Sequence, residues 1–337
     1  MITGNIDLSV GSVAGLTGAI VAMLQVHFLP GILPEYISSP LLISLMSITI
    51  TIILGALIGL WHGFLISYAS VPSFIVTLGG MLFFRGAVLG VTKGITISPL
   101  LPDFRILGSG YMSHFTGYLL AVIIILIIWG NFLVQIKNKN QLPWQEPLLD
   151  FIKNIIISFF IIILTLILNS YRGIPNPVLI MIVLGFIFNY ISKHTSFGRY
   201  VFAIGGNTEA SRLAGINVKL NLLIVFVLIG VLTAISGIIL TARLNAATNS
   251  AGNMFELSAI TACAIGGISL FGGKGSILNA IIGALIIASI DNGMSMINIE
   301  MFWQQMIKGL ILIGVVWLDI SYQRKAYVKS SFISTGT

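Results

Sequence analysis

The segment SFGRYVFAIGGNTEASRLAGINVK, residues 196–219, is the longest well-patterned polar stretch between strongly apolar parts of the chain. Within it, Asn207 is a residue type that caps helix N-termini, and Glu209 falls in the first turn, where a negative charge suits the helix dipole. Gly215 is able to end the helix in a left-handed conformation. These signals predict a helix of about two turns that starts after Asn207.

The predicted helix has one small apolar face. Ala210, Leu213 and Ala214 follow the i, i+3, i+4 spacing that places side chains on the same side of a helix. A short helix in a polar segment can bind another protein through such an apolar face. The sequence therefore predicts a docking element in this segment.

The composition of the whole chain is that of a membrane protein. Hydrophobic residues make up 57% of the 337 positions and charged residues only 8%, and the mean hydropathy is +1.04. These values lie far outside the usage of soluble globular proteins. We expect an all-α, polytopic transmembrane bundle, because long apolar helices satisfy their own backbone hydrogen bonds in lipid.

About 20 apolar residues are needed to cross a hydrocarbon core of roughly 30 Å. Ten segments qualify as candidate spans, and the first, third and eighth are rich in glycine and polar residues, so we expect broken or re-entrant helices there. The candidate spans are 8–29, 41–68, 72–92, 116–136, 151–168, 176–192, 219–242, 255–272, 276–298 and 302–320.

The distribution of lysine and arginine predicts the orientation of the chain, since cytoplasmic loops retain these residues. One set of alternate loops holds eleven of them and the other set holds four, with two more inside spans. The eleven are Lys137, Lys139, Lys153, Lys193, Arg199, Arg212, Lys219, Lys274, Arg324, Lys325 and Lys329. This bias places the docking segment and the C-terminus in the cytoplasm. It also accounts for the net charge of +7 without nucleic acid as a partner.

Several motifs resemble the ribose/xylose-type sugar permeases of ABC transporters, and together they cover nearly the whole chain. They are IDLSVGS (6–12), VPSFIVTL (71–78), GGN (205–207), AIGGISLFGG (264–273) and WQQMIKG (303–309). The segments YRGIPNPVL (171–179) and DNGMSM (291–296) are most similar to the D-xylose branch, which has extra membrane spans in its middle. The order Glu209-Ala210-Ser211 followed by Gly215 resembles the coupling helix of such permeases, although the Ile-x-Leu-Pro ending of the fuller motif is missing.

The resemblance implies an inner-membrane permease subunit that imports a monosaccharide, D-xylose in the first place. Its partners would be an ABC ATPase, a periplasmic or extracellular sugar-binding protein, membrane lipid and a second copy of the permease. ATP and Mg²⁺ would be bound by the ATPase and no cofactor by this chain. The residues expected to couple to the ATPase are Asn207, Glu209, Ala210, Ser211, Arg212, Leu213 and Gly215.

The whole chain, 1–337, is expected to be one permease domain, with 196–219 as a cytoplasmic coupling segment. In the family, the motif at 6–12 follows further membrane sequence. The chain is therefore expected to be shortened at its N-terminus, and a naturally short family member is the alternative.

Two groups of polar residues are candidates for the sugar path, because hydroxyls, amides and carboxylates hydrogen-bond polyols. The first group is Asn5, Asp7, Ser9 and Ser12, for which capping of the first helix by Asp7 is the structural alternative. The second is Asp291 and Asn292, for which an ion pair between Asp291 and Lys308 is the alternative.

Charges inside spans are expensive in lipid. Asp7, Arg85, Glu256, Asp291 and Lys308 are therefore expected to face the bundle, a cavity or an interface.

The sequence offers no site for catalysis or for a metal. The segment GGKGS (272–276) is not a phosphate-binding loop, because Ile268 stands where such a loop needs its first glycine and Gly275 follows Lys274 in place of Ser or Thr. It is expected to be a tight turn. The four histidines lack ligand spacing, and Cys263 is the single cysteine. The chain is thus expected to be a transport subunit without its own ATPase site.

A second hypothesis is a self-contained, ion-coupled transporter in which Asp291 or Glu256 carries a proton or sodium ion. Such transporters are usually built from repeated halves, and no internal repeat is evident in the sequence. The energy source separates the two hypotheses, since an ABC importer depends on ATP.

Glycine stripes within the spans predict close helix packing. Gly55, Gly59 and Gly63 recur every four residues, and Gly11 and Gly15 have the same spacing. Stripes of small residues let neighbouring helices approach closely in a membrane, where no hydrophobic drive brings helices together.

Overall fold

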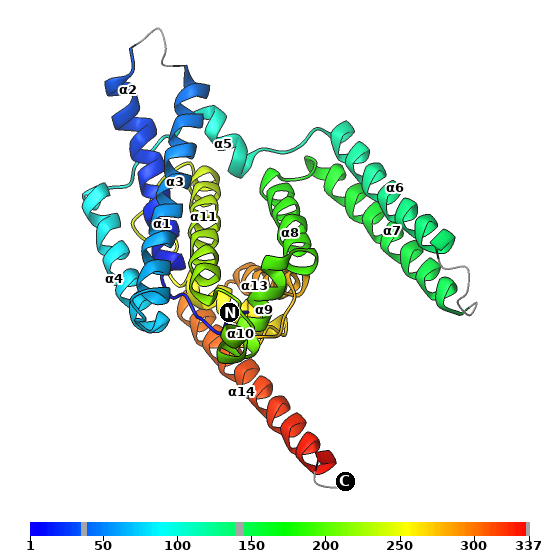
Figure 1. Cartoon of the computed structure of the whole chain (residues 1–337). Helices are drawn as coiled ribbons and strands as arrows, with labels where there is room; N and C mark the ends of the chain where they lie inside the picture. The colour runs from blue at the N-terminus through cyan, green and yellow to red at the C-terminus, as the bar shows by residue number, and fades with distance from the viewer. Residues whose placement is uncertain (35–38, 139–144, 335–337) are drawn as a thin grey trace. The chain divides into compact units, whose positions relative to one another are not determined.

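The computed structural model describes residues 1–34, 39–138 and 145–334. The predicted all-α bundle is confirmed, and Figure 1 shows helices throughout the described part of the chain. The helices are α1 (Val10–Met23), the π-helix η1 (Leu24–Phe28), α2 (Leu29–Ile32), α3 (Pro40–Ser67), α4 (Ser73–Thr92), α5 (Pro102–Ser109), α6 (His114–Asn138), α7 (Gln145–Tyr171), α8 (Asn176–His194), α9 (Ser196–Gly206), α10 (Thr208–Leu213), α11 (Val218–Leu244), α12 (Phe255–Ile265), α13 (Ile277–Met296) and α14 (Met301–Ser334). Of the lysines counted for orientation, Lys139 lies outside the described residues.

Within the described residues, nine helices are long and apolar enough to cross a membrane, and a tenth apolar helix, α12, is shorter. The prediction of about ten spans, some of them broken, is therefore confirmed. The first span contains the π-helical turn η1, whereas the third is the continuous helix α4, so the prediction of a break there is wrong.

The eighth span was placed at 255–272, but its helix ends at Ile265. Gly266 caps α12, and Gly267 takes a positive φ of 74° that favours glycine. The 11 residues of α12 extend about 16 Å, which is half of a hydrocarbon core of roughly 30 Å. The predicted break in this segment is therefore confirmed, and only a half-length helix forms within 255–272.

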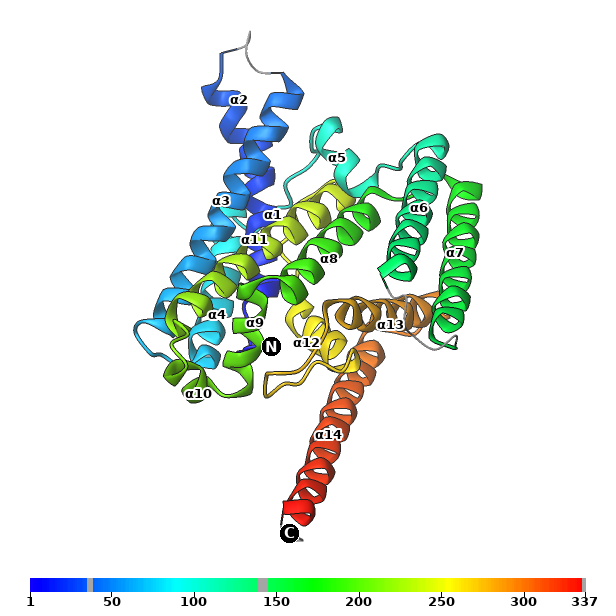
Figure 2. The ribbon, with the colours of Figure 1, turned by 45° about the vertical axis from the view of Figure 1, so that its right-hand side comes forward.

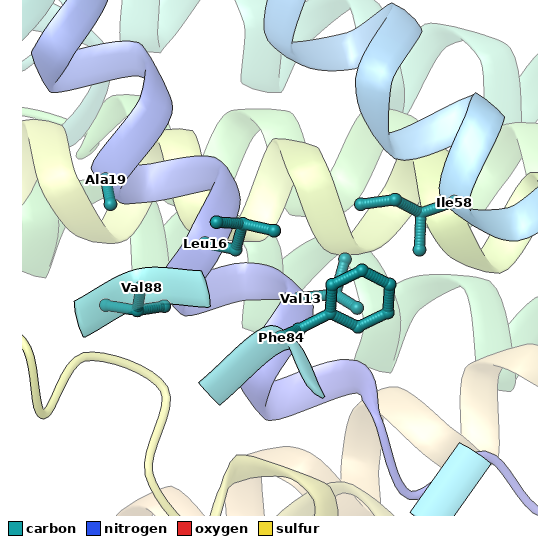
Figure 3. Close-up of a cluster of buried hydrophobic side chains, with 6 residues drawn as sticks. All are labelled: Val13, Leu16, Ala19, Ile58, Phe84 and Val88. Atoms are coloured by element: carbon teal, nitrogen blue, oxygen red, sulfur yellow. The ribbon is translucent and has the colours of Figure 1, made fainter. Parts of the chain in front are cut away.

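The chain divides into two compact units, one formed by residues 1–104 and 183–337 and the other by 105–182. The first unit is built around α1, whose side chains are buried for most of its length. Figure 3 shows Val13, Leu16 and Ala19 of α1 packed against Ile58 of α3 and against Phe84 and Val88 of α4. The second unit is dominated by the hairpin of α6 and α7, in which Trp129 Nε1 donates a hydrogen bond to Ser158 Oγ at 3.1 Å.

The predicted glycine stripe of α3 packs on α11, which lies beside α3 in Figure 1. A Cβ atom added at Gly55 would lie 2.6 Å from Ala234 Cβ, and one at Gly59 would lie 2.8 Å from Val227 Cα. Such distances are too short for any side chain. The stripe therefore lets the two backbones touch, as predicted for helix association in a membrane.

The helices of the first unit run between two ends of the bundle. One end, which we call the α10 end, holds α10, residues 1–6 and the turn between α3 and α4. Thr77 Oγ1 near the start of α4 lies 3.4 Å from the carbonyl of Ile6, and Lys219 at the start of α11 lies 5.7 Å from the ring of Tyr68. The opposite end holds the segment 93–101 and the last turn of α11, where Leu100 N donates to Asn245 Oδ1 at 3.0 Å.

The segment 245–276 crosses the first unit from the opposite end to the α10 end, partly without helix. It pairs with the segment after α4, where Ala247 and Ile97 exchange two backbone hydrogen bonds of 3.0 and 3.1 Å. Farther along, Ala251 O accepts from Arg85 at 3.1 Å and lies against Gly15.

After α12, the segment reaches the α10 end, where Gly273 N donates to Ile2 O at 2.8 Å. Gly15 therefore accommodates the irregular backbone at Ala251, and Gly11 accommodates both Gly252 and Glu256 at the start of α12. Irregular backbone at membrane depth is stable only where protein surrounds it or a cavity borders it.

Helices α3 and α13 share a short sequence and a similar turn at their ends. The sequence Gly-Ala-Leu-Ile at 55–58 in α3 recurs at 283–286 in α13. Fifteen positions after each first glycine, Ser70 and Asn298 both take a positive φ, of 57° and 56°, in the turn to the next helix.

Candidate functional site

The docking helix α10 forms where the sequence predicts it. Asn207 caps α10 by accepting a hydrogen bond from Ala210 N at 2.9 Å. After the helix ends, Gly215 takes the predicted left-handed conformation, with a φ of 82°. Thr195 caps the preceding helix, α9, in the same way by accepting from Gly198 N at 3.2 Å. Two short capped helices in succession give the polar segment a fixed path at the α10 end.

The outer surface of α10 carries both charge and apolar area. Glu209 and Arg212 form an ion pair of 2.6 Å, and both side chains are mostly exposed. Leu213 is 81% exposed, whereas Ser211 is buried and donates to Asn207 O at 2.9 Å. The predicted apolar face therefore points away from the described part of the chain.

A tight backbone junction connects α9 to two other parts of the chain at the α10 end. A Cβ atom added at Gly205 would overlap Ile2 O and lie 2.6 Å from Gly273 N, while one at Gly206 would meet nothing. The predicted tight turn at 272–276 is confirmed by the positive φ values of Gly272, Gly273 and Gly275. We call the contact of Gly205 with Ile2 and Gly273 the glycine junction.

A cavity of about 490 Å³ lies in the first unit and is partly open. Helices α1, α11, α12 and α13 line it, and Figure 2 shows α12 next to α13. Its polar lining consists of Thr233 and Ser236 from α11, Ser258 from α12 and Asp291 from α13. The predicted path residue Asp291 thus lies in a cavity together with three hydroxyl side chains.

The ion pair predicted between Asp291 and Lys308 is present. Lys308 Nζ lies 3.3 Å from each carboxylate oxygen, and the two side chains are 34% and 25% exposed. The hydrogen bond goes to Oδ2, and among the described residues Oδ1 accepts none. Lys308 also lines a second cavity, of about 330 Å³, so the pair lies between the two cavities.

The other predicted path residues lie outside the lining of the 490 Å³ cavity. Asp7 Oδ1 accepts from both the backbone and the hydroxyl of Ser9, at 2.8 and 2.6 Å. The side-chain amide of Asn5 donates a hydrogen bond to Thr3 O at 3.3 Å, and Ser12 is buried on α1. Asn292 is exposed, and its amide lies 3.8 Å from the sulfur of Met296.

The cavity residues Thr233, Ser236 and Ser258 were not predicted from the sequence. Ser236 interrupts a strongly apolar span, which was the available signal, because a polar side chain at membrane depth needs a polar neighbour. The presence of Ser236 in an apolar span does not tell which polar residue lies beside it. Only the fold brings α11, α12 and α13 around one space.

The remaining intramembrane charges are shielded from lipid, as predicted. Glu256 is 6% exposed in the first turn of α12, lies against Gly11, and its Oε2 has no hydrogen-bond partner among the described residues. Arg85 binds Ala251 O. Across the described ranges, no group of three or more His, Cys, Asp or Glu side chains is arranged to hold a metal ion.

Comparison with known proteins places this architecture in a family. The model of the family described as branched-chain amino acid transport system / permease component matches residues 1–316. The chain is 45% identical to the xylose transport system permease protein XylH of Haemophilus influenzae, over 96% of this chain and 84% of that protein. It is 40% identical to XylH of Escherichia coli K12, over 97% of this chain and 80% of that protein.

A more distant relative is the ribose import permease protein RbsC of Escherichia coli K12. It is 32% identical over 95% of this chain and 78% of RbsC. No solved structure matches the chain. A family model that matches nearly the whole chain, together with relatives of this identity, shows that the chain is a multi-pass membrane permease component and belongs to the branched-chain amino acid transport system / permease component family.

Proposed function

We propose that this chain is the membrane-spanning subunit of an ABC importer that moves D-xylose across the inner membrane with ATP hydrolysed by a partner subunit. The observation that carries the proposal is the 45% and 40% identity to xylose permeases over 96–97% of the chain. The lower identity of 32% to a ribose permease favours xylose over ribose as the sugar.

The partners follow from the same assignment. An ABC ATPase, with its ATP and Mg²⁺, would bind at the α10 end, and a sugar-binding protein would bind at the opposite end. Two copies of the permease would surround a central path in the lipid bilayer. The whole chain would act as one permease domain, with its C-terminus in the cytoplasm, because the eleven-to-four bias of lysine and arginine favours that side.

The contact with the ATPase would be made by the segment 196–219. Leu213 offers an exposed apolar anchor and the pair Glu209–Arg212 offers charge beside it. A few central residues carry most of the binding energy between proteins, and arginine is enriched among them, which favours Arg212 as the main contact. Asn207, Ala210, Ser211 and Gly215 would hold the helix in shape for that contact.

Uptake measurements in reconstituted vesicles test the function. The permease is combined with the ATPase and the xylose-binding protein, and uptake of labelled D-xylose is followed with ATP inside the vesicles. We expect uptake that stops when ATP is depleted and continues with an uncoupler present. Ribose with its own binding protein serves as the control for the sugar.

One observation favours the alternative, an ion-coupled transporter. Glu256 is a buried carboxyl without a hydrogen-bond partner for Oε2 in the described structure, which is the kind of group that binds a proton or cation. If uptake survives ATP depletion and stops with an uncoupler, and if Glu256→Gln abolishes it, the chain is an ion-coupled transporter and the proposed function is wrong.

A further inference from the structure

The cavity between α1, α11, α12 and α13 combines apolar walls with a few polar side chains at membrane depth. Its volume of about 490 Å³ falls in the range of roughly 300–1,000 Å³ that small-molecule sites occupy. Such sites are mostly apolar, with a small number of placed polar groups. The size therefore suits a small molecule better than a single ion.

The hydroxyls of the cavity are available to a ligand. Ser236 is exposed on α11, Ser258 is partly exposed on α12, and no side-chain hydrogen bond of either serine is seen in the described structure. The hydroxyl of Thr233 donates a hydrogen bond to Ile229 O at 2.7 Å, and its oxygen can still accept a hydrogen bond. Hydroxyls that line one cavity from two helices can both donate to and accept from an uncharged, hydroxyl-bearing molecule.

Asp291 adds a strong acceptor whose charge is balanced. Lys308 Nζ hydrogen-bonds Oδ2 and lies 3.3 Å from Oδ1 as well. Oδ1 is buried and has no hydrogen-bond partner in the described part of the chain, so a ligand reaches it only when the side chain turns toward the cavity. A carboxylate has about four acceptor positions, so one lysine leaves most of them unused. Because the pair has no net charge, it offers little attraction to an anion or a second cation. The carboxylate of Asp291 is therefore best suited to accept hydrogen bonds from the hydroxyl groups of a neutral ligand.

We propose that this cavity is a sugar-binding subsite of the permease, in which Asp291, Ser236 and Ser258 hydrogen-bond the hydroxyls of a neutral monosaccharide. Phe255 and the alanines of α12 and α13 contact the C–H groups of the sugar ring. This inference rests on the proposed function and assigns Ser236 and Ser258 as residues that contact the sugar.

A pair of tryptophan substitutions on α13 tests the cavity in the reconstituted complex. Ala288 lines the cavity and the adjacent Ser289 is exposed but outside the lining. We expect Ala288→Trp to lower the rate of D-xylose uptake at least tenfold, and Ser289→Trp to change it less than twofold. Both variants should keep the ATPase subunit bound. Uptake by Ala288→Trp at the wild-type rate would overturn the proposal.

Thiol labelling tests the same cavity without ATP, so its outcome is independent of the energy source. Cysteine is placed at Ser258 after Cys263→Ala, and the complex is treated with a charged, water-soluble thiol reagent with and without D-xylose. We expect labelling that D-xylose slows several-fold, while a cysteine at Thr96, exposed in the segment after α4, is labelled at a rate that the sugar does not change. Reaction of position 258 only with a lipid-soluble reagent would show that lipid fills the cavity, and the sugar subsite would be refuted.

Discussion

At the scale of single residues, Glu209 determines the charge of the outer surface of α10. Glu209→Lys places a positive charge at the positive end of the helix, which costs up to about 1 kcal/mol, and sets it beside Arg212. We expect the variant to reach the membrane at normal levels and to lose sugar uptake. Glu209→Gln, which removes the charge without reversing it, is the control. Normal ATPase binding and uptake by Glu209→Lys would contradict the role of α10.

The pair Asp291–Lys308 gives a second residue-scale prediction. Removing Lys308 leaves the carboxylate without a counterion, and removing Asp291 does the same to the lysine. We expect Lys308→Gln and Asp291→Asn each to lower thermal stability in detergent more than the double variant does. Because about a third of the Asp291 side chain is exposed, the coupling energy should be small, about 1 kcal/mol. Additive effects of the two changes would mean that the pair contributes nothing.

At the scale of elements, the close contact of α3 and α11 depends on the glycine stripe. A leucine at Gly59 would clash with Phe226 and Val227, so α3 and α11 must separate. We expect Gly59→Leu to destabilise the protein by about 1–3 kcal/mol or more and to lower the yield of assembled complex. Gly90 on α4 meets nothing within reach of a Cβ atom, so Gly90→Leu is the matched control. Equal yields of the two variants would contradict the packing argument.

Elements of this fold were predictable from sequence where local signals act alone. Asn207 and Gly215 define α10 because capping depends on neighbours a few positions away. A break within 255–272 was predictable from its glycine and polar residues, but the place where α12 begins was not, because the irregular backbone before it depends on Arg85 and Gly15, far away in the chain. The cavity required Ser236, Ser258 and Asp291 to meet. Their meeting is a property of the fold and of no single segment.

At the scale of the whole molecule, the functional assignment depends on which side of the membrane each end of the first unit faces. We expect a cysteine at Thr208, in a chain with Cys263→Ala, to be protected from an impermeant thiol reagent outside intact cells. A cysteine at Thr96, exposed at the opposite end, should be labelled. Thr96 is a better probe than Asn249, which is half-buried and hydrogen-bonded to Thr92. Labelling of position 208 from outside would place α10 where no ATPase can reach it.

The glycine junction has a consequence for how force would pass through the protein. Because Gly205 touches Ile2 and Gly273 backbone to backbone, no flexible side chain lies between them to absorb a displacement of α9. Residues 271–273 lead through one short turn to α12 and α13, which line the cavity. We therefore expect a displacement of α9 and α10 to move residues 271–273 and, through them, the helices α12 and α13 that line the cavity. Gly205→Val would force α9 away from Ile2 and Gly273, because even a Cβ atom there overlaps Ile2 O. We expect ATP hydrolysis to continue while uptake falls. A Cβ atom at Gly206 would meet nothing, so in Gly206→Val we expect sugar uptake to keep its wild-type ratio to ATP hydrolysis.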